Sequence, residues 1–384
     1  MRKVYVLGVG QTRFGKLRET AREATVTAAR EAIECAGVEA RDIGAAFVTN
    51  AFGIVEKQAH LGPIVMSALG VPEVPATTVE SACASGGSAL REAYVNVAGG
   101  FYDVVLAAGA EKVSQLDTLT ATTYFSYGSD YLMEGGNAVC FPGLYATMAT
   151  AHMNKYGTTE EQMAAVAVKN HGNAMHNPKA HFHKAITIDD VLNSMVVTSP
   201  LKLFDCCPFS DGAAAVILCS EEVAKKHADT PIEVIGSGRA GAPGALHDRE
   251  DLTAISSTVL ATKQALEQAR LTLKDIDFAE VHDCFTIAEI MATEDIGFVD
   301  KGEGGRAAEE GLTKIDGEIP INPSGGLKAK GHPVGATGLG QIVEVYEQLM
   351  GEAGRRQVEG AEVALTHNIG ATGGSCAVHI LRRV

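Results

Sequence analysis

The chain repeats part of itself. Residues 28–52 (AAREAIECAGVEARDIGAAFVTNAF) align without a gap on residues 261–285 (ATKQALEQARLTLKDIDFAEVHDCF), and nine of the 25 positions are identical. Each copy has the pattern of an amphipathic helix, a turn with Asp-Ile and a short apolar strand. A repeat of this kind predicts two similar α/β halves rather than a single continuous domain.

The halves also begin alike, because residues 6–10 (VLGVG) resemble residues 234–238 (VIGSG). We predict an N-terminal half over residues 1–230 and a C-terminal half over residues 231–384. Apolar runs such as VVLAA at 104–108 are typical of parallel strands covered by helices.

Between the apolar strands, residues 113–200 depart from the strand–helix rhythm. They carry Tyr, Met, His, Asn and Pro in a less regular order. We interpret this stretch as an insertion in the first half that walls a substrate pocket. The alternative is that it only covers the core or makes subunit contacts.

Composition excludes several classes of protein. The 384 residues are 46% hydrophobic and 21% charged, which is globular, and the net charge of −15 repels nucleic acid. No apolar run is long enough to span a membrane. The eight cysteines form no CxxC pair and the N-terminus fits no signal peptide, so we expect free thiols, mostly buried, in the cytoplasm.

Cys83 is the first candidate for chemistry. An extended run ends near Glu80 and a helical pattern begins near Ser85, so the thiol lies at a strand-to-helix turn among small residues. Backbone N–H groups and the helix dipole favour a thiolate there. A buried structural cysteine is the alternative.

His332 is the second candidate. Two glycine-rich turns bracket it, Pro333 fixes the backbone that follows, and a helix is predicted to begin within a few residues. In the repeat, this loop corresponds to the loop that carries Cys83. We predict that the two loops meet across the pseudo-twofold axis as a nucleophile and a base.

Two further stretches follow predicted strands. His282 and Cys284 end the second copy of the repeat, where the first copy has Thr49 and Ala51, and this departure suggests a function; their spacing fits no zinc site. The turn at 366–374 (THNIGATGG) can offer backbone N–H groups to an oxyanion, or can be an ordinary turn between strands.

Other patterns are weaker. His171, His176, His181 and His183 match no standard metal site, and we expect them in a solvated or substrate-lining loop. The Gly8-Val9-Gly10 turn lacks the third glycine of a dinucleotide fingerprint. We predict neither a metal nor a nucleotide cofactor.

Taken together, these stretches resemble the thiolase family over nearly the whole chain. The motifs are GHPVGATG at 331–338, CASG at 83–86 and SDGAAAV at 210–216. The resemblance implies two similar halves in a five-layered α-β-α-β-α arrangement, with a loop domain inserted in the first half.

One departure places the chain within the family. Many thiolases carry a second cysteine in a Cys-x-Gly turn and an Asn-Glu-Ala-Phe motif, whereas this chain has Asn368-Ile369-Gly370 and His282-Asp283-Cys284-Phe285. The pattern resembles the archaeal and sterol-carrier-protein-type thiolases.

The resemblance also implies roles. Cys83 is acylated by an acyl-CoA, and His332 generates its thiolate and binds the thioester oxygen. Cys284 moves a proton at the α-carbon of the second acyl-CoA, and His282 orients water or the second thioester oxygen.

The late turn completes this implied site. Gly370 and Asn368 belong to it as oxyanion or substrate-binding residues. The N–H groups of Cys83 and Gly370 are expected to hold the oxyanion of the acyl-enzyme step.

The expected activity is reversible condensation of acyl-CoA and thiolysis of a β-ketoacyl-CoA, by default acetoacetyl-CoA, with coenzyme A as substrate and no cofactor. Expected partners are a second copy in a homodimer or dimer of dimers, a small zinc-binding OB-fold protein and a hydroxymethylglutaryl-CoA synthase. Three alternatives stay open: a larger or aryl-substituted substrate, a ketosynthase or hydroxymethylglutaryl-CoA synthase of the same fold, and a non-catalytic subunit that binds acyl-CoA or lipid.

Overall fold

A single nine-stranded sheet runs through the computed structural model, which describes residues 1–137 and 139–384. The strand order is β3-β2-β4-β7-β1-β8-β11-β10-β9. The strands of this sheet are β1 (Val4–Gln11), β2 (Ala45–Thr49), β3 (Ala76–Val79), β4 (Val104–Glu111), β7 (Gly212–Ser220), β8 (Ile232–Gly241), β9 (Phe278–Glu280), β10 (Val363–Gly370) and β11 (Ser375–Arg383).

The sheet consists of two half-sheets with the same order. From the centre outward the first is β1-β7-β4-β2-β3 and the second is β8-β11-β10-β9, and a bridge between Ala279 and Ile321 takes the place of a fifth strand. Only two residue pairs, Tyr5 with Glu233 and Val6 with Ile232, join β1 to β8. The predicted two-fold internal similarity is therefore present in the topology.

The prediction of parallel strands was only half right. β4 pairs parallel with β2 but antiparallel with β7, and β10 pairs parallel with β9 but antiparallel with β11. A strand buried on both faces is apolar throughout whichever way its neighbours run, so the apolar runs could not reveal this direction.

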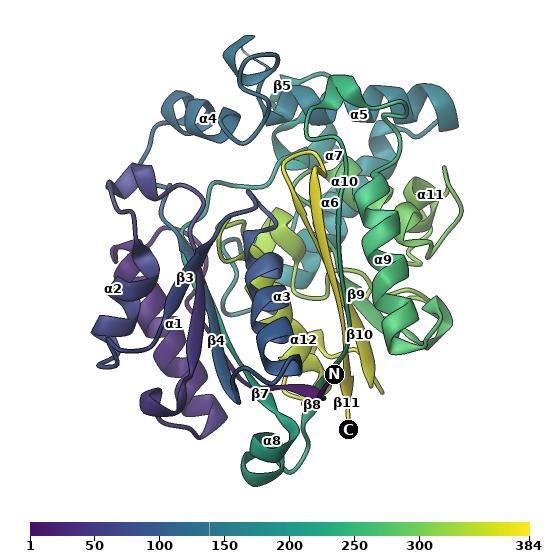
Figure 1. The fold of residues 1–384 in the computed structure, drawn as a ribbon. Coiled ribbons are helices and arrows are strands. Elements are labelled where there is room, and N and C mark those ends of the chain that lie inside the picture. The colour runs from purple at the N-terminus through teal and green to yellow at the C-terminus, as the bar shows by residue number, and fades with distance from the viewer. Residues whose placement is uncertain (138) are drawn as a thin grey trace.

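Helices separate and cover the half-sheets in five layers (Figure 1). α3 (Ser85–Ala98) and α12 (Thr337–Leu349) lie in the middle, between the two half-sheets. The outer layers contain α1 (Ala21–Ala36) and α2 (Leu61–Ala68) on one side, and α9 (Ser256–Ala269), α10 (Thr286–Ile296) and α11 (Gly304–Glu309) on the other. α8 (Glu221–His227) follows β7.

Close packing of the first strand against the first helix explains the repeat. A Cβ on Gly10 would collide with the carbonyl of Ala28 on α1, and a Cβ on Gly238 would collide with the carbonyl of Ala261 on α9. The same alanines are paired in the sequence alignment. In each half, the backbone of a strand therefore packs directly against the backbone of a helix. This close contact requires glycine on the strand and a small residue such as alanine on the helix.

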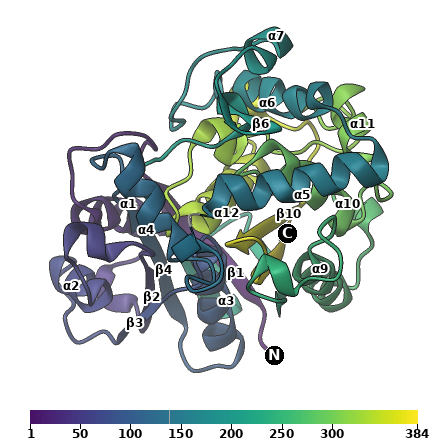
Figure 2. The same cartoon turned by 90° about the horizontal axis from the view of Figure 1, so that it is seen from above.

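The stretch 113–200 is more regular than its sequence predicted. Five of its elements are helices or strands: α4 (Thr118–Ser126), α5 (Phe141–Tyr156), α6 (Glu160–Ala174), α7 (Ile188–Leu192) and β5 (Val196–Thr198), which pairs with β6 (Leu201–Lys202). Figure 2 shows these helices gathered over one end of the layered core. Side chains from α4, α5 and β5 wall a cavity, as predicted.

Short helical turns complete the chain: η1 (Ala40–Asp42), η2 (Gly53–Glu56), η3 (Gly135–Asn137), η4 (Leu203–Asp205), η5 (Leu246–Asp248), η6 (Leu273–Asp275), η7 (Gly326–Lys330) and η8 (Gly354–Arg356). In the described ranges, no helix has both the length and the apolar character that crossing a membrane requires.

Candidate active site

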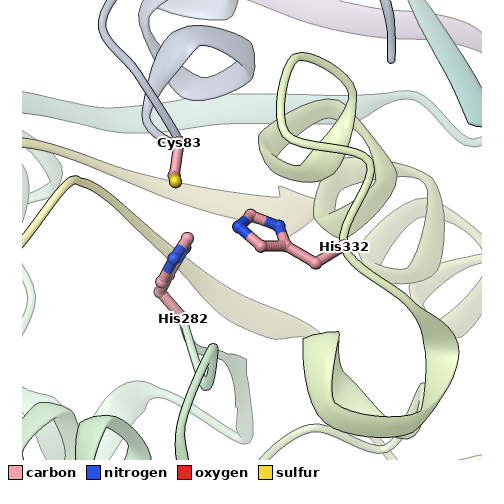
Figure 3. Close-up of side chains that lie close together, drawn as sticks. All are labelled: Cys83, His282 and His332. Carbon is pink, nitrogen blue, oxygen red and sulfur yellow. The ribbon is translucent and has the colours of Figure 1, made fainter. Parts of the chain in front are cut away.

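Three predicted residues from distant segments meet at one end of the central layer. Cys83 precedes α3, His332 precedes α12 and His282 follows β9. The thiol sulfur and one ring nitrogen of each histidine all lie within 4.8 Å of one another. Figure 3 shows the thiol and the two imidazole rings around a common space. The predicted meeting of the Cys83 and His332 loops is confirmed.

The turn that carries Cys83 is tightly built. Ala82 has a positive φ of 49°, and the Ser85 hydroxyl accepts a hydrogen bond from the Ser81 amide at 2.8 Å. A Cβ on Gly86 would press on the backbone of Gly338, so α3 and α12 touch through glycine where the two loops meet. The turn therefore holds Cys83 at a fixed place above the first turn of α3.

The resting form of Cys83 differs from the predicted thiolate. Burial raises the pKa of the thiol to about 12, although a hydrogen bond from the Ala371 backbone N–H acts in the opposite direction. The nearby carboxylate of Glu111 raises this pKa further. In this site the loss of hydration outweighs the helix N-terminus, so Cys83 needs a base to become a nucleophile.

His332 has a defined tautomer. Its Nδ1 lies 2.6 Å from the Thr337 hydroxyl oxygen, and that hydroxyl donates its own proton to the Pro333 carbonyl at 2.9 Å. On this geometry we assign His332 the Nδ1–H tautomer, with the Thr337 hydroxyl oxygen as the acceptor and a free lone pair on Nε2. Burial lowers the pKa of His332 to about 3, so the ring is neutral.

His282 has the opposite tautomer, because Asn368 fixes it. The Asn368 side-chain NH₂ donates to the Cys83 carbonyl at 2.9 Å, and its oxygen accepts from the Gly87 amide at 3.1 Å. These backbone groups cannot exchange roles, so the NH₂ also faces His282 Nδ1, 3.1 Å away, as a donor. The proton of the neutral ring is then on Nε2.

The His282 Nε2 is buried and has no hydrogen-bond partner among the described residues. Burial and the neighbouring His332 lower the pKa of His282 well below its usual range, so the ring stays neutral. A buried N–H without a partner is costly. An acceptor on a substrate would satisfy it.

Cys284 lies in the same cavity as Cys83 but is not part of the three-residue cluster. Burial raises the pKa of its thiol well above the ordinary value, and a hydrogen bond with the Tyr145 hydroxyl lowers it. The Tyr145 hydroxyl donates its one proton to the Ala371 carbonyl at 2.9 Å, and the Tyr145 ring stacks on Phe285 with 4.6 Å between centroids. Tyr145 was not singled out in the sequence.

The turn at 366–374 is an ordinary turn between strands, and it also lies next to Cys83. It connects antiparallel strands β10 and β11. A Cβ on Gly370 would collide with the Ser81 carbonyl, so this backbone touches the Cys83 loop. The next residue, Ala371, adopts a positive φ of 54° and directs its N–H to the Cys83 sulfur.

Glu111 is a functional candidate that the sequence did not reveal. Its buried carboxylate accepts hydrogen bonds from the amides of Ala51, Phe52 and Gly335, each at 3.1 Å, and from the side chain of Asn50. Burial raises its pKa to about 7. Glu111 therefore ties the loop that follows β2 to the loop that carries His332.

A cavity of about 380 Å³ leads to Cys83. Its walls are mainly apolar and include three cysteines that the sequence did not single out, Cys140, Cys206 and Cys207. Among the described residues, the lining contains no Lys or Arg. The full lining is Cys83, Thr118, Thr122, Phe125, Cys140, Phe141, Pro142, Tyr145, Met195, Val197, Leu203, Cys206, Cys207, Pro208, Phe209, Cys284, Phe285, His332 and Ala371.

The prediction of a solvated or substrate-lining loop is confirmed for only part of the histidine cluster. His176 and His183 are exposed and His181 is half-buried, all three in the segment that follows α6, whereas His171 is buried within α6 and stacks on Phe182. His181 pairs with the Ser210 hydroxyl at 2.9 Å, and His183 contacts the Asn177 carbonyl at 2.8 Å. None of the four lines the cavity at Cys83.

Comparison with family models matches almost the whole chain. Residues 4–222 match the thiolase N-terminal domain, and residues 238–383 match the model described as thiolase C-terminal domain-like.

Three curated relatives are similar over nearly their full lengths. An acetyl-CoA acetyltransferase of Methanothermobacter thermautotrophicus is 53% identical, with 100% of each chain covered. An acetyl-CoA acetyltransferase of Methanocaldococcus jannaschii is 42% identical, with 99% of each covered. The benzoylsuccinyl-CoA thiolase subunit BbsB of Thauera aromatica is 36% identical, with 98% of this chain and 96% of the relative covered.

Solved structures agree with the architecture. An Ltp2–ChsH2(DUF35) aldolase superposes with a TM-score of 0.86 at 25% identity, covering 99% of this chain and 97% of the other. Human mitochondrial 3-ketoacyl-CoA thiolase superposes with a TM-score of 0.77 at 20% identity, covering 99% and 98%. At that identity the second comparison supports the fold alone.

Proposed function

The chain belongs to the thiolase family, and from that premise we propose that Cys83 carries the acyl group in reversible condensation and thiolysis of acyl-CoA. The observation that supports this most is the pairing of Cys83 with a neutral His332 whose free lone pair is on Nε2. A buried thiol with a raised pKa reacts only when such a base takes its proton.

In the first half-reaction His332 Nε2 takes the Cys83 proton and the sulfur attacks the thioester carbon. The N–H groups of Cys83 and Gly370 hold the oxyanion, and the Ala371 N–H stabilises the thiolate before attack. The C–S bond of the substrate breaks, and the coenzyme A thiolate leaves with the proton from His332. The acyl group is then on Cys83.

In the second half-reaction a further acyl-CoA enters. The His282 Nε2–H donates to its thioester oxygen, His332 Nε2 takes the Cys284 thiol proton, and the Cys284 thiolate removes a proton from the α-carbon. The carbanion attacks the acyl carbon, the bond to Cys83 breaks, the Cys83 sulfur takes the proton back from His332, and a β-ketoacyl-CoA forms. Thiolysis runs through the same steps in reverse, with Cys284 as the acid.

We propose acetoacetyl-CoA and acetyl-CoA as the substrates, in line with the names of the two archaeal relatives. The apolar cavity suits a pantetheine arm, whose amides and methyl groups carry no charge. A second candidate is a larger or aryl β-ketoacyl-CoA, because Phe125, Phe141 and Phe209 line the same cavity and one relative is a benzoylsuccinyl-CoA thiolase subunit.

We further propose a cytoplasmic homodimer or dimer of dimers, with halves at 1–230 and 231–384. The similarity to a chain of the Ltp2–ChsH2(DUF35) aldolase supports a small OB-fold partner for this chain. A hydroxymethylglutaryl-CoA synthase as a third component is proposed from the family resemblance alone.

Intact-mass measurement and peptide mapping after incubation with acetyl-CoA test the proposal. We expect one acetyl group on Cys83 and none in the Cys83→Ala variant. Acetylation of another residue in the variant, or full thiolysis by it, would remove Cys83 from the role of nucleophile. A parallel incubation with a benzoyl-substituted substrate separates the two substrate candidates.

A further inference from the structure

The Cys83, His282 and His332 cluster has the composition of a soft-metal site. Thiolate and imidazole are the ligands that Zn²⁺ prefers, and three protein ligands with an open position are typical of catalytic zinc. The three donor atoms already lie within 4.8 Å of one another and are buried. An acyl-transfer site of this geometry is exposed to poisoning by a thiophilic cation.

A histidine binds a metal only through a nitrogen that has a free lone pair, and the hydrogen bond at its other nitrogen decides which nitrogen that is. His332 satisfies this rule, because Thr337 accepts its Nδ1–H and leaves Nε2 bare. His282 does not, because Asn368 donates to its Nδ1 and leaves the proton on Nε2.

We propose that Asn368 holds His282 in the tautomer opposite to that of His332, and that this lock keeps the Cys-His-His cluster from capturing a thiophilic divalent cation such as Zn²⁺. The amide orientation is enforced by backbone, since the Cys83 carbonyl accepts from the Asn368 NH₂ and the Gly87 amide donates to its oxygen. The same lock presents the His282 Nε2–H to the substrate.

The advantage of excluding a metal rests on the proposed function, because it protects Cys83 for acyl transfer. The tautomer of His282 and the metal affinity can be measured in the absence of any reaction. Asn368→Asp replaces the donor by a carboxylate, which accepts from His282 Nδ1–H and frees Nε2. A carboxylate–histidine–metal arrangement of this kind changes metal affinity by about 10-fold to 100-fold. We therefore expect Asn368→Asp to bind Co²⁺, and Zn²⁺ in competition with it, at least about 10-fold more tightly than the native enzyme.

The titration follows the thiolate-to-cobalt absorption band of the unacylated enzyme, with circular dichroism and thermal melting as checks on folding. Asn368→Ala, which neither donates nor accepts, should bind between the two. The double variant Asn368→Asp/His282→Gln should return to native affinity. Equal affinity of folded Asn368→Asp and native protein would overturn the proposal, as would tight binding by the native protein.

A second measurement needs no variant at residue 368. Nitrogen-15 NMR of histidine-labelled protein distinguishes a protonated from a bare ring nitrogen, and His282→Gln and His332→Asn assign the signals. We expect Nε2–H on His282 and Nδ1–H on His332. The same tautomer on both rings would refute the lock, whether or not Cys83 is acetylated. Opposite tautomers would support the lock even if the acetylation experiment found no acetyl group on Cys83.

Discussion

The side-chain amide of Asn368 lies 2.9 Å from the carbonyl oxygen of Cys83, although 285 positions separate them in the chain. A residue near the end of β10 in the second half thus holds the loop of the first half that carries Cys83. The reverse connection also exists, because Glu111 at the end of β4 binds the Gly335 amide beside His332. Residues of both halves form the site, since Cys83 comes from the first half and His282 and His332 come from the second. Neither half alone contains all three.

Cys284→Ala should separate the two half-reactions. Acylation of Cys83 depends on His332, so burst-phase acetylation should persist, whereas condensation needs a proton acceptor and should fall about 10²-fold to 10⁴-fold. The comparison of intact mass with the rate of acetoacetyl-CoA formation measures both. Cys219→Ala, a buried cysteine in β7 outside the cavity, is the control and should retain both steps. Unchanged condensation in Cys284→Ala would exclude this residue from the proton transfer.

Thr337→Val should reduce the rate of acylation with little effect on substrate binding. The hydroxyl accepts from His332 Nδ1–H and so keeps the lone pair on Nε2, facing the thiol. Without it the ring is free to tilt or to change tautomer, and misplacement of this order costs up to about 10²-fold. Single-turnover acetylation is the measurement. Thr337→Ser retains the hydroxyl and should recover most of the rate; an equal loss in both variants would point to helix packing instead.

Much of this arrangement was predictable from sequence. The repeat predicted two halves, and the turn residues around Cys83 and His332 predicted their meeting, because turn chemistry is local and leaves a clear pattern. The pKa of Cys83 was not predictable, since it depends on how completely the loops exclude water. Tyr145 and Glu111 were missed for a related reason: each acts through contacts with residues far away in the chain, and a lone Tyr or Glu leaves no local pattern.

The stability of the fold should fall as the pH is lowered below about 6.5, the ordinary pKa of histidine. Burial lowers the pKa of six histidines of the described residues, to about 3 for His332 and His367 and to about 4 for His171 and His379, with His181 below and His282 well below the usual range. Between these values and 6.5 the unfolded chain binds protons that the native protein does not. Linkage then reduces the free energy of unfolding as the pH falls.

Five carboxyls of the described residues act in the opposite direction. Burial raises the pKa of Glu111 and of Asp283 to about 7, and it also raises the pKa values of Asp205, Glu280 and Asp295. The native protein therefore holds protons there that the unfolded chain has lost above about pH 4.5. The contribution of Glu111 and Asp283 is lost as the pH rises through 7. Because the histidines outnumber them, urea unfolding should show a net loss of stability from pH 6.5 to pH 4. A net gain on acidification would mean that the histidines are hydrated in solution.

Gly238→Ala tests the packing that underlies the repeat. Its new Cβ would meet the backbone carbonyl of Ala261 on α9, which cannot move without displacing the helix from β8. Overpacking against backbone costs about 1–3 kcal/mol or more, and the free energy of unfolding in urea should fall by at least that amount. Gly10→Ala should behave alike, because the Ala28 carbonyl on α1 occupies the equivalent place.

Gly244→Ala is the matched control: no atom lies within 4 Å of its Cβ, and its effect should stay within about 0.5 kcal/mol. If Gly238→Ala were as mild as the control, the strand–helix contact would be looser than the structure places it, and the close approach would not explain why both copies of the repeat retain alanine on the helix face.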